Sequence, residues 1–251
     1  MARYIKLAET KSTNTYMKGV AAELPHATVI YTYRQTAGRG QIGNSWESED
    51  GKNLTFSMLL KPPGIDVQRQ FYISEAASLA LADMLSQYTP DIKIKWPNDI
   101  YYRDQKICGM LIENVLNGGG IAYSIIGIGL NINQDNFVSN APNPVSLKNI
   151  TGTEYDTEAL LRDLCNRIET LCNFNDYSKA DLQALHERYL ATLYRNDGDA
   201  HQWQLPDGTI FSGTIVDVQP DGKLTLRHEA DGSEHQYYFK EVKHVINHHI
   251  L

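Results

Sequence analysis

Several features that mark particular classes of protein are rare or absent in this sequence. Among its 251 residues there are only three cysteines, an odd number in which no pair has CxxC spacing, which disfavours a disulfide framework or a cysteine-rich zinc site. We expect Cys108, Cys165 and Cys172 to be reduced core residues. No apolar run reaches the roughly 20 residues of a membrane-spanning helix, and the N-terminus lacks the regions of a secretory signal. The sequence therefore predicts a cytoplasmic protein with no membrane partner.

Positive charge is also scarce. The chain has 23 Lys and Arg against 30 Asp and Glu, which gives a formal net charge of −7. Broad binding to nucleic acid depends on neutralising phosphates with Lys and Arg, so we expect no nucleic-acid partner. An anionic substrate would have to meet a local cluster of basic residues.

The patterns that are present are typical of a mixed α/β (α+β) fold. Up to about residue 133, short β-branched and aromatic runs alternate with helical stretches. Five runs are interpreted as strands: 27–33, 54–60, 92–96, 107–115 and 121–132. Apolar residues at helical spacing predict a central buried helix over 67–88 and a helical pair over 156–173 and 178–194.

The composition changes after residue 195. Four Asp-Gly turn signals separate short alternating runs, which predicts a small all-β barrel. We place a domain boundary there, with one domain over 1–195 and a second over 196–251. The second domain has too small a core for independent stability to be expected, so we expect it to pack against the first.

The strongest local motif is a basic, glycine-spaced loop that follows the first predicted strand. It contains Gly38, Arg39 and Gly40. Glycines let the backbone approach a ligand, and exposed amides beside an arginine form an anion cradle. The loop is not a Walker motif, because no Lys-Ser/Thr follows its last glycine. The alternative is a surface turn without function.

Two further segments carry candidate chemistry. KWPND at 95–99 is followed by Lys106, so a short hairpin would present a lysine beside amide and carboxylate groups; the alternative is a plain hairpin. GIGLNIN at 127–133 is an apolar strand with two glycines, which suggests a bulge or the close passage of a ligand. Packing against the central helix is the alternative there.

Together these motifs are specific. GRGQIGNSW, KWPND, KICGMLIEN and GIGLNIN occur in the order and approximate spacing of the catalytic domain of biotin protein ligases, and the segment ETKSTNT at 9–15 matches the family's early Ser-Thr-Asn segment. The chain resembles that family over about residues 1–133, in a form without an N-terminal DNA-binding domain. The resemblance implies a catalytic domain similar to that of class II aminoacyl-tRNA synthetases, followed by a C-terminal SH3-like barrel.

The resemblance also implies a set of site residues. Lys106 and Arg39 are expected to be catalytic, contacting the biotin carboxylate and the α-phosphate. The expected biotin contacts are Ser12, Thr13, Asn14, Gln35, Gly38, Arg39, Gly40, Gln41, Lys106, Gly109, Leu111 and Gly127. The expected nucleotide contacts are Arg39, Gln41, Trp46, Asn98, Lys106 and Asn131. Asp99 is the candidate ligand of Mg²⁺, because hard cations favour oxygen ligands.

Gln41 departs from the form of the motif in which a second arginine follows, Gly-Arg-Gly-Arg. A neutral amide cannot supply the forked, charge-assisted contact of arginine. We expect Gln41 to hydrogen-bond the adenylate. We also expect the adenylate to be held less tightly than it would be with arginine at this position.

The reaction implied by the resemblance has two steps. The biotin carboxylate attacks the α-phosphate of ATP, giving biotinyl-5′-AMP and pyrophosphate, and a lysine of a biotin carboxyl carrier protein or domain then takes the biotinyl group. The expected substrates and partners are thus biotin, ATP with Mg²⁺ and the carrier, with no tightly bound cofactor; a homodimer is possible. A lipoate protein ligase of the same fold, a biotin-responsive regulatory protein and a non-catalytic binding module are the alternatives.

Overall fold

The computed structural model describes residues 3–40, 45–138 and 143–246. Its first sheet has seven strands in the order β1-β2-β3-β7-β6-β5-β4. β1 and β2 pair in parallel and the other neighbours pair antiparallel, so the sheet is mixed. The strands are β1 (Arg3–Leu7), β2 (Thr28–Thr32), β3 (Leu54–Leu60), β4 (Ile92–Lys95), β5 (Asp99–Tyr102), β6 (Gln105–Asn117) and β7 (Gly120–Leu130). The predicted mixed α/β class is confirmed.

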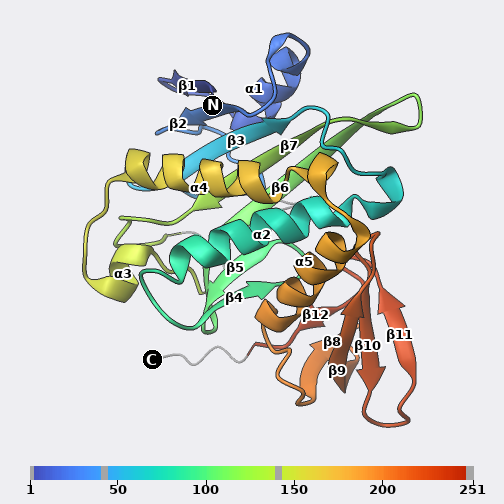
Figure 1. Ribbon diagram of the computed structural model, residues 1–251. Coiled ribbons are helices and arrows are strands. Elements are labelled where there is room, and N and C mark those ends of the chain that lie inside the picture. Colours follow the sequence, from blue (N-terminus) through green and yellow to red (C-terminus); the bar gives the residue numbers. More distant parts are fainter. Residues whose placement is uncertain (1–2, 41–44, 139–142, 247–251) are drawn as a thin grey trace.

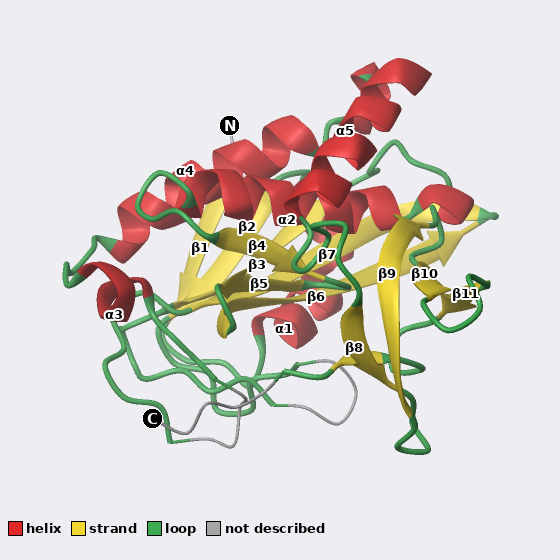
Figure 2. Ribbon diagram, turned by 90° about the horizontal axis from the view of Figure 1, so that it is seen from below, coloured by secondary structure: helices red, strands yellow, loops and turns green. Residues whose placement is uncertain are grey.

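Helices cover the two faces of this sheet unequally. The helices are α1 (Thr13–Val20), α2 (Phe71–Leu85), α3 (Leu147–Thr151), α4 (Thr157–Leu171) and α5 (Lys179–Thr192). Figure 2 shows α2, α4 and α5 on one side of the sheet and α1 on the other. The thinly covered side leaves room for a site beside α1.

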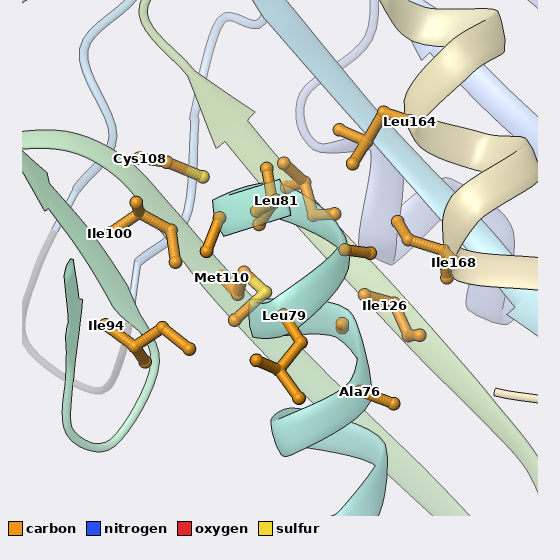
Figure 3. Close-up of a cluster of buried hydrophobic side chains, with 14 of the residues drawn as sticks. Ala76, Leu79, Leu81, Ile94, Ile100, Cys108, Met110, Ile126, Leu164 and Ile168 are labelled. Carbon is orange, nitrogen blue, oxygen red and sulfur yellow. The ribbon is translucent and has the colours of Figure 1, made fainter. Parts of the chain in front are cut away.

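The main core lies between the sheet and the helices α2 and α4. Figure 3 shows Leu79 and Leu81 of α2 among Ile100, Met110 and Ile126 from the strands. Every residue of α2 from Ala76 to Ala82 is buried, as the broad apolar face in the sequence predicted. Burying each leucine, isoleucine or methionine side chain of this layer contributes about 1.5–3 kcal/mol, which makes the layer the rigid support of the sheet.

The helix starts follow ordinary capping chemistry. At α4 the Asp156 carboxylate accepts hydrogen bonds from the backbone N–H groups of Glu158 and Ala159. At α5 Ser178 and Asp181 form a reciprocal capping box. The helical pair was therefore predictable from its caps. Helix α1 was not predicted, because it has only eight residues and its Ser12 N-cap makes no side-chain cap bond.

The C-terminal segment forms a separate antiparallel sheet in the order β11-β10-β9-β8-β12 (Figure 1). Its strands are β8 (His201–Gln204), β9 (Ile210–Val218), β10 (Leu224–His228), β11 (Glu234–Tyr237) and β12 (Lys243–His244). Gly208, Gly222 and Gly232 have positive φ in the intervening turns, as the Asp-Gly signals predicted. A closed barrel is not seen in the described residues, because β11 and β12 lie at opposite edges and do not pair. The boundary at 195/196 stays a prediction.

Specific contacts join the second sheet to the rest of the chain. The Trp96 indole N–H donates to the Gly222 carbonyl at 2.9 Å. The His186 ring on α5 lies between the carboxylates of Glu75 on α2 and Asp217 on β9, at 2.9 and 2.8 Å. Hydrogen bonding to Glu75 raises the pKa of His186 to about 9, so this link is an ionic one at neutral pH.

The three cysteines, and His244 near the C-terminus, are all buried. All three cysteines are free and buried, and burial raises the pKa of the Cys165 thiol to about 12, as expected for core residues. Three histidines lie near the C-terminus: His248, His249 and, on β12, His244. His244 is only 8% exposed, and its ring centroid lies 3.8 Å from that of Trp203 with the two planes tilted by 35°. The other two histidines lie outside the described residues.

Within the described ranges, no helix is long and apolar enough to cross a membrane.

Candidate active site

A cavity of about 100 Å³ lies on the α1 side of the main sheet. It is formed by the start of α1, the basic loop, the β5–β6 hairpin and β7. Its lining residues are Ser12, Thr13, Asn14, Gln35, Arg39, Gly40, Ser45, Trp46, Asn98, Asp99, Lys106, Gly109, Met110, Leu111, Gly127, Ile128 and Gly129. All three sequence motifs and the early Ser-Thr-Asn segment therefore meet in one place.

The floor of the cavity is set by strand register. Ser57 on β3, Gly127 on β7 and Leu111 on β6 lie directly opposite one another, and Gly129 lies opposite Gly109. Because successive side chains alternate between faces, the same strands can send Ile126 and Ile128 into the core. The floor thus combines a rigid base with positions that carry no side chain.

These glycines are required by what lies over them. A Cβ at Gly127 would be 2.1 Å from Asn14 Oδ1, and a Cβ at Gly129 would be 2.2 Å from Trp46 Cε2. Either distance is far inside van der Waals contact. The contact of Gly127 with the ligand stays a prediction. In the structure, the missing side chain at Gly127 makes room for Asn14.

Asn14 makes the central polar contacts at one end of the cavity. Its amide nitrogen donates to the Leu111 carbonyl at 3.0 Å and to Glu113 Oε2 at 2.9 Å. Its amide oxygen accepts from the Ser57 hydroxyl at 2.6 Å. Asn14 is 3% exposed and Ser57 is fully buried, so this network is held in a low-dielectric environment where its geometry is strongly fixed.

A second chain of hydrogen bonds continues from Ser57. Its hydroxyl lies 2.8 Å from Thr13 Oγ1, and the Thr13 backbone N–H donates to Gln35 Oε1 at 2.9 Å. Gln35 lines the cavity, and since its oxygen is engaged, its Nε2 is the donor that the side chain still offers. This end of the cavity therefore offers both hydrogen-bond acceptors and donors.

Arg39 lies over the same end. Its Nη1 is 3.3 Å from Thr15 Oγ1 and 3.7 Å from Glu113 Oε2. The arginine side chain is about half exposed, so these contacts are weak and the guanidinium can turn toward an anion.

Lys106 stands at the other end. It lies near the start of β6, and its Nζ forms an ion pair with Asp99 Oδ1 at 2.7 Å, with both side chains mostly buried. The Asn98 amide nitrogen donates to the Met110 carbonyl, which fixes the turn before β5. The hairpin thus holds a cation over the floor, with a carboxylate that orients it.

Trp46 fills much of the space between these two ends. Its ring touches the bare faces of Gly109 and Gly129, and Lys106 Nζ lies 5.8 Å from the ring centroid. The indole N–H is buried and has no partner within the described residues. The remaining volume is below the roughly 300 Å³ or more of typical ligand pockets, so a ligand that spans both ends must displace this ring.

The described residues contain no group of three or more His, Cys, Asp or Glu that could hold a metal ion. Asp99 supplies one carboxylate, one oxygen of which already pairs with Lys106. Mg²⁺ is commonly bound by one or two carboxylates together with substrate phosphates. The site therefore fits an ion that arrives with a nucleotide rather than a dedicated protein metal site.

Comparison with known proteins agrees with this geometry. A sequence model of the biotin/lipoate A/B protein ligase family matches residues 7–131. A biotin–[acetyl-CoA-carboxylase] ligase of Paracoccus denitrificans is 32% identical over 62% of this chain and 67% of its own length. The chain belongs to the biotin/lipoate A/B protein ligase family.

Other relatives extend the match. The bifunctional ligase/repressor BirA of Bacillus subtilis is 33% identical over 80% of this chain, which spans only 62% of that relative's length. The structure of the Aquifex aeolicus biotin protein ligase in complex with biotin and ATP superposes with a TM-score of 0.78, covering 98% of this chain and 100% of that one. At 23% identity this likeness shows a shared fold.

Most of the predicted site residues line the cavity, and two of the described ones do not. Gly38 lies behind it, where a Cβ would be 2.5 Å from the Trp46 carbonyl oxygen. Asn131 is buried; its nitrogen donates to the Val145 carbonyl and its Oδ1 has no partner within the described residues. Gln41 lies outside the described residues.

Sequence reasoning missed Ser57, Glu113 and Gly129. Ser57 and Glu113 lie behind the lining residues and act through Asn14. Glu113 and Gly129 were within the quoted motifs, so their side of the strand could have been assigned by counting in twos from Leu111 and Gly127. Ser57 carries no signal beyond being a polar residue inside an apolar strand.

Proposed function

We propose that this chain is an ATP-dependent biotin protein ligase. The observation that carries the proposal is the cavity itself, which joins a polar head-group end at Asn14, Ser57 and Gln35 to a cationic end at Lys106. Biotin has the same division: a ureido ring with N–H donors and a carbonyl acceptor, and a carboxylate on a flexible chain. The Paracoccus denitrificans relative named above is a biotin–[acetyl-CoA-carboxylase] ligase.

The head-group end distinguishes biotin from lipoate. A dithiolane ring has no N–H or carbonyl group, so it would leave the Asn14 oxygen and the Gln35 amide without new partners. A buried polar group without its partner costs about 1–3 kcal/mol. For this reason we favour biotin over the lipoate alternative, although the family includes both kinds of ligase.

The first half-reaction takes place at the cationic end. The biotin carboxylate attacks the α-phosphorus of ATP, an anhydride bond to AMP forms, and the bond to pyrophosphate breaks. Lys106 stabilises the negative charge that gathers on the phosphoryl oxygens, and Arg39 turns from Glu113 toward the same anion. Asp99 orients Lys106 through the 2.7 Å ion pair.

The nucleotide requires the space that Trp46 occupies. We propose that the ring leaves the faces of Gly109 and Gly129 and covers the adenylate from outside. The buried Oδ1 of Asn131 has no hydrogen-bond partner in the described part of the chain, which suits the exocyclic amine of adenine. Asn98 would contact the nucleotide from the β5 turn. Asp99 would supply one oxygen ligand to Mg²⁺, whose charge neutralises the phosphates when it is bound.

In the second half-reaction an acceptor amine displaces AMP from the biotinyl carbonyl. We propose that the acceptor is a lysine of a biotin carboxyl carrier protein or domain. Gln41 stands where a second arginine would give a forked contact to phosphate. We therefore propose that the adenylate dissociates faster from this chain when no acceptor is present.

The proposal is tested by biotin-dependent exchange of labelled pyrophosphate into ATP, with biotin and lipoate compared in parallel. We expect exchange with biotin and little with lipoate. Exchange with lipoate alone would refute the proposal. Lys106→Met serves as the control, because it keeps a side chain of similar length and removes the charge.

A further inference from the structure

Glu113 lies at the boundary between the basic loop and the head-group end of the cavity. It is on β6, its side chain is 20% exposed, and it is not among the residues that line the cavity. Its Oε2 accepts a hydrogen bond from the Asn14 amide at 2.9 Å. It therefore acts on a ligand through the residues that it contacts, and the shortest of these contacts is the one to Asn14.

We infer that Glu113 selects the ligand by fixing the orientation of the Asn14 amide. An amide side chain can present either its oxygen or its nitrogen to a given side, and the choice depends on its hydrogen-bond network. This inference rests on the proposed function, because it takes biotin as the ligand. It assigns to Asn14 the recognition of one ring N–H group of the cyclic urea of biotin.

The network leaves only one orientation without conflict. Both amide hydrogens of Asn14 point to oxygens that can only accept, the Leu111 carbonyl and the Glu113 carboxylate. If the amide were turned over, its oxygen would face two acceptors and both contacts would become repulsive. The Ser57 hydroxyl does not decide the matter, because a hydroxyl can donate or accept.

With the amide so fixed, its oxygen faces the floor of the cavity. Oδ1 lies where a Cβ of Gly127 would be 2.1 Å away. It accepts one hydrogen bond, from Ser57, and an amide oxygen has a second lone pair. That lone pair is available to an N–H donor of the ligand. A ligand atom that carries a lone pair at the same place would be repelled.

The cations around Glu113 have a separate role. Arg39 lies 3.7 Å and Lys18 lies 4.0 Å from its carboxylate oxygens. Both cations are about half exposed, so each ion pair contributes little. They compensate the charge of a partly buried carboxylate, whereas the bond to Asn14 sets the chemistry of the cavity.

The test compares biotin with two isosteric analogues, in each of which one ureido N–H is replaced by a ring oxygen. Affinity is measured by titration calorimetry for the unaltered protein and for Glu113→Ala, Glu113→Gln and Lys18→Met. We expect the unaltered protein to bind one of the analogues about 10- to 100-fold more weakly than biotin. In Glu113→Ala only the Leu111 carbonyl still orients the amide, so turning it over creates one repulsive contact instead of two, and we expect this ratio to fall by at least about threefold.

Two variants separate this role from charge and from folding. Glu113→Gln can still accept from Asn14 through its own amide oxygen, so most of the discrimination should return. Lys18→Met removes a neighbouring charge without touching Asn14, and its ratio should equal that of the unaltered protein. If Glu113→Ala does not fold, Glu113→Met, which fills similar space, takes its place.

Kinetics give an independent readout. Because the head group is bound alike before and during the reaction, Glu113→Ala should raise KM for biotin and leave kcat within about twofold. The inference is overturned if Glu113→Ala keeps the full discrimination, or if Glu113→Gln loses as much as Glu113→Ala. Failure of the unaltered protein to bind biotin would instead refute the proposed function.

Discussion

Substituting Gly127 by alanine is the sharpest structural perturbation of the head-group end. The new Cβ would lie 2.1 Å from Asn14 Oδ1, whereas even close C···O contacts are about 3.3 Å. The Asn14 side chain must therefore move by about 1 Å. Backbone relaxation cannot relieve the clash easily, because β7 is paired with β3 on one side and β6 on the other.

The magnitude follows from the bonds that this movement disturbs. Asn14 makes hydrogen bonds of 2.6 to 3.0 Å with Ser57, Glu113 and the Leu111 carbonyl. A shift of that size takes them beyond useful length, at about 1 kcal/mol each. Overpacking a buried site costs about 1–3 kcal/mol. We expect Gly127→Ala to lower the free energy of unfolding by about 2 kcal/mol and to weaken biotin binding about 100-fold.

Titration calorimetry with biotin and thermal unfolding measure the two effects. Gly120→Ala is the matched control, because it lies on the same strand with nothing within 4 Å of an added Cβ. It should change neither quantity by more than about 1 kcal/mol. If Gly127→Ala binds biotin as tightly as the unaltered protein, Asn14 does not contact the head group and the assignment of this end of the cavity is wrong.

Three other predictions concern charge. Lys106→Met should slow biotin-dependent pyrophosphate exchange about 100- to 1,000-fold while biotin affinity, measured by calorimetry, changes less than tenfold. Asp99→Asn should reduce exchange by about tenfold, because the amide keeps the shape and loses the ion pair; a loss as large as that of Lys106→Met would mean that Asp99 acts directly. The pKa of His186 is raised to about 9, so its bonds to Glu75 and Asp217 contribute fully below its ordinary pKa of 6.5 and are lost as pH rises through 9. Unfolding by urea at pH 7 and pH 10 should show the loss, and His186→Gln should remove most of this difference.

The sequence predicted the main sheet and the large helices because their periodicity is strong. The expected strand at 54–60 coincides with β3 (Leu54–Leu60), and the predicted central helix contains α2 (Phe71–Leu85). Short elements were missed where periodicity is too brief to register, as in α1 and α3. The β-barrel was predicted from turn signals between short alternating runs and from the family resemblance. Turns and alternation indicate where strands form and where the chain reverses, but not whether the outermost strands meet.

The sequence predicted those site residues that lie within a motif and line the cavity. Ser57 acts through Asn14 and lies outside every quoted motif, so it was missed for want of a mark. Glu113 lies within a quoted motif and was missed because its side of the strand was not assigned. Two functions of glycine were also indistinguishable in the sequence. Gly127 makes room for Asn14, whereas Gly38 allows close passage of the Trp46 backbone; only the folded structure shows which neighbour each one accommodates.

The central claim is that this chain activates biotin and transfers it to a carrier lysine. The most direct measurement is the intact mass of a biotin carboxyl carrier domain after incubation with the protein, biotin and MgATP. We predict the addition of one biotinyl group, which disappears when biotin is replaced by lipoate or when the carrier's target lysine is replaced by arginine. An unchanged carrier mass in the complete reaction, from protein that is folded and binds biotin, would contradict the account.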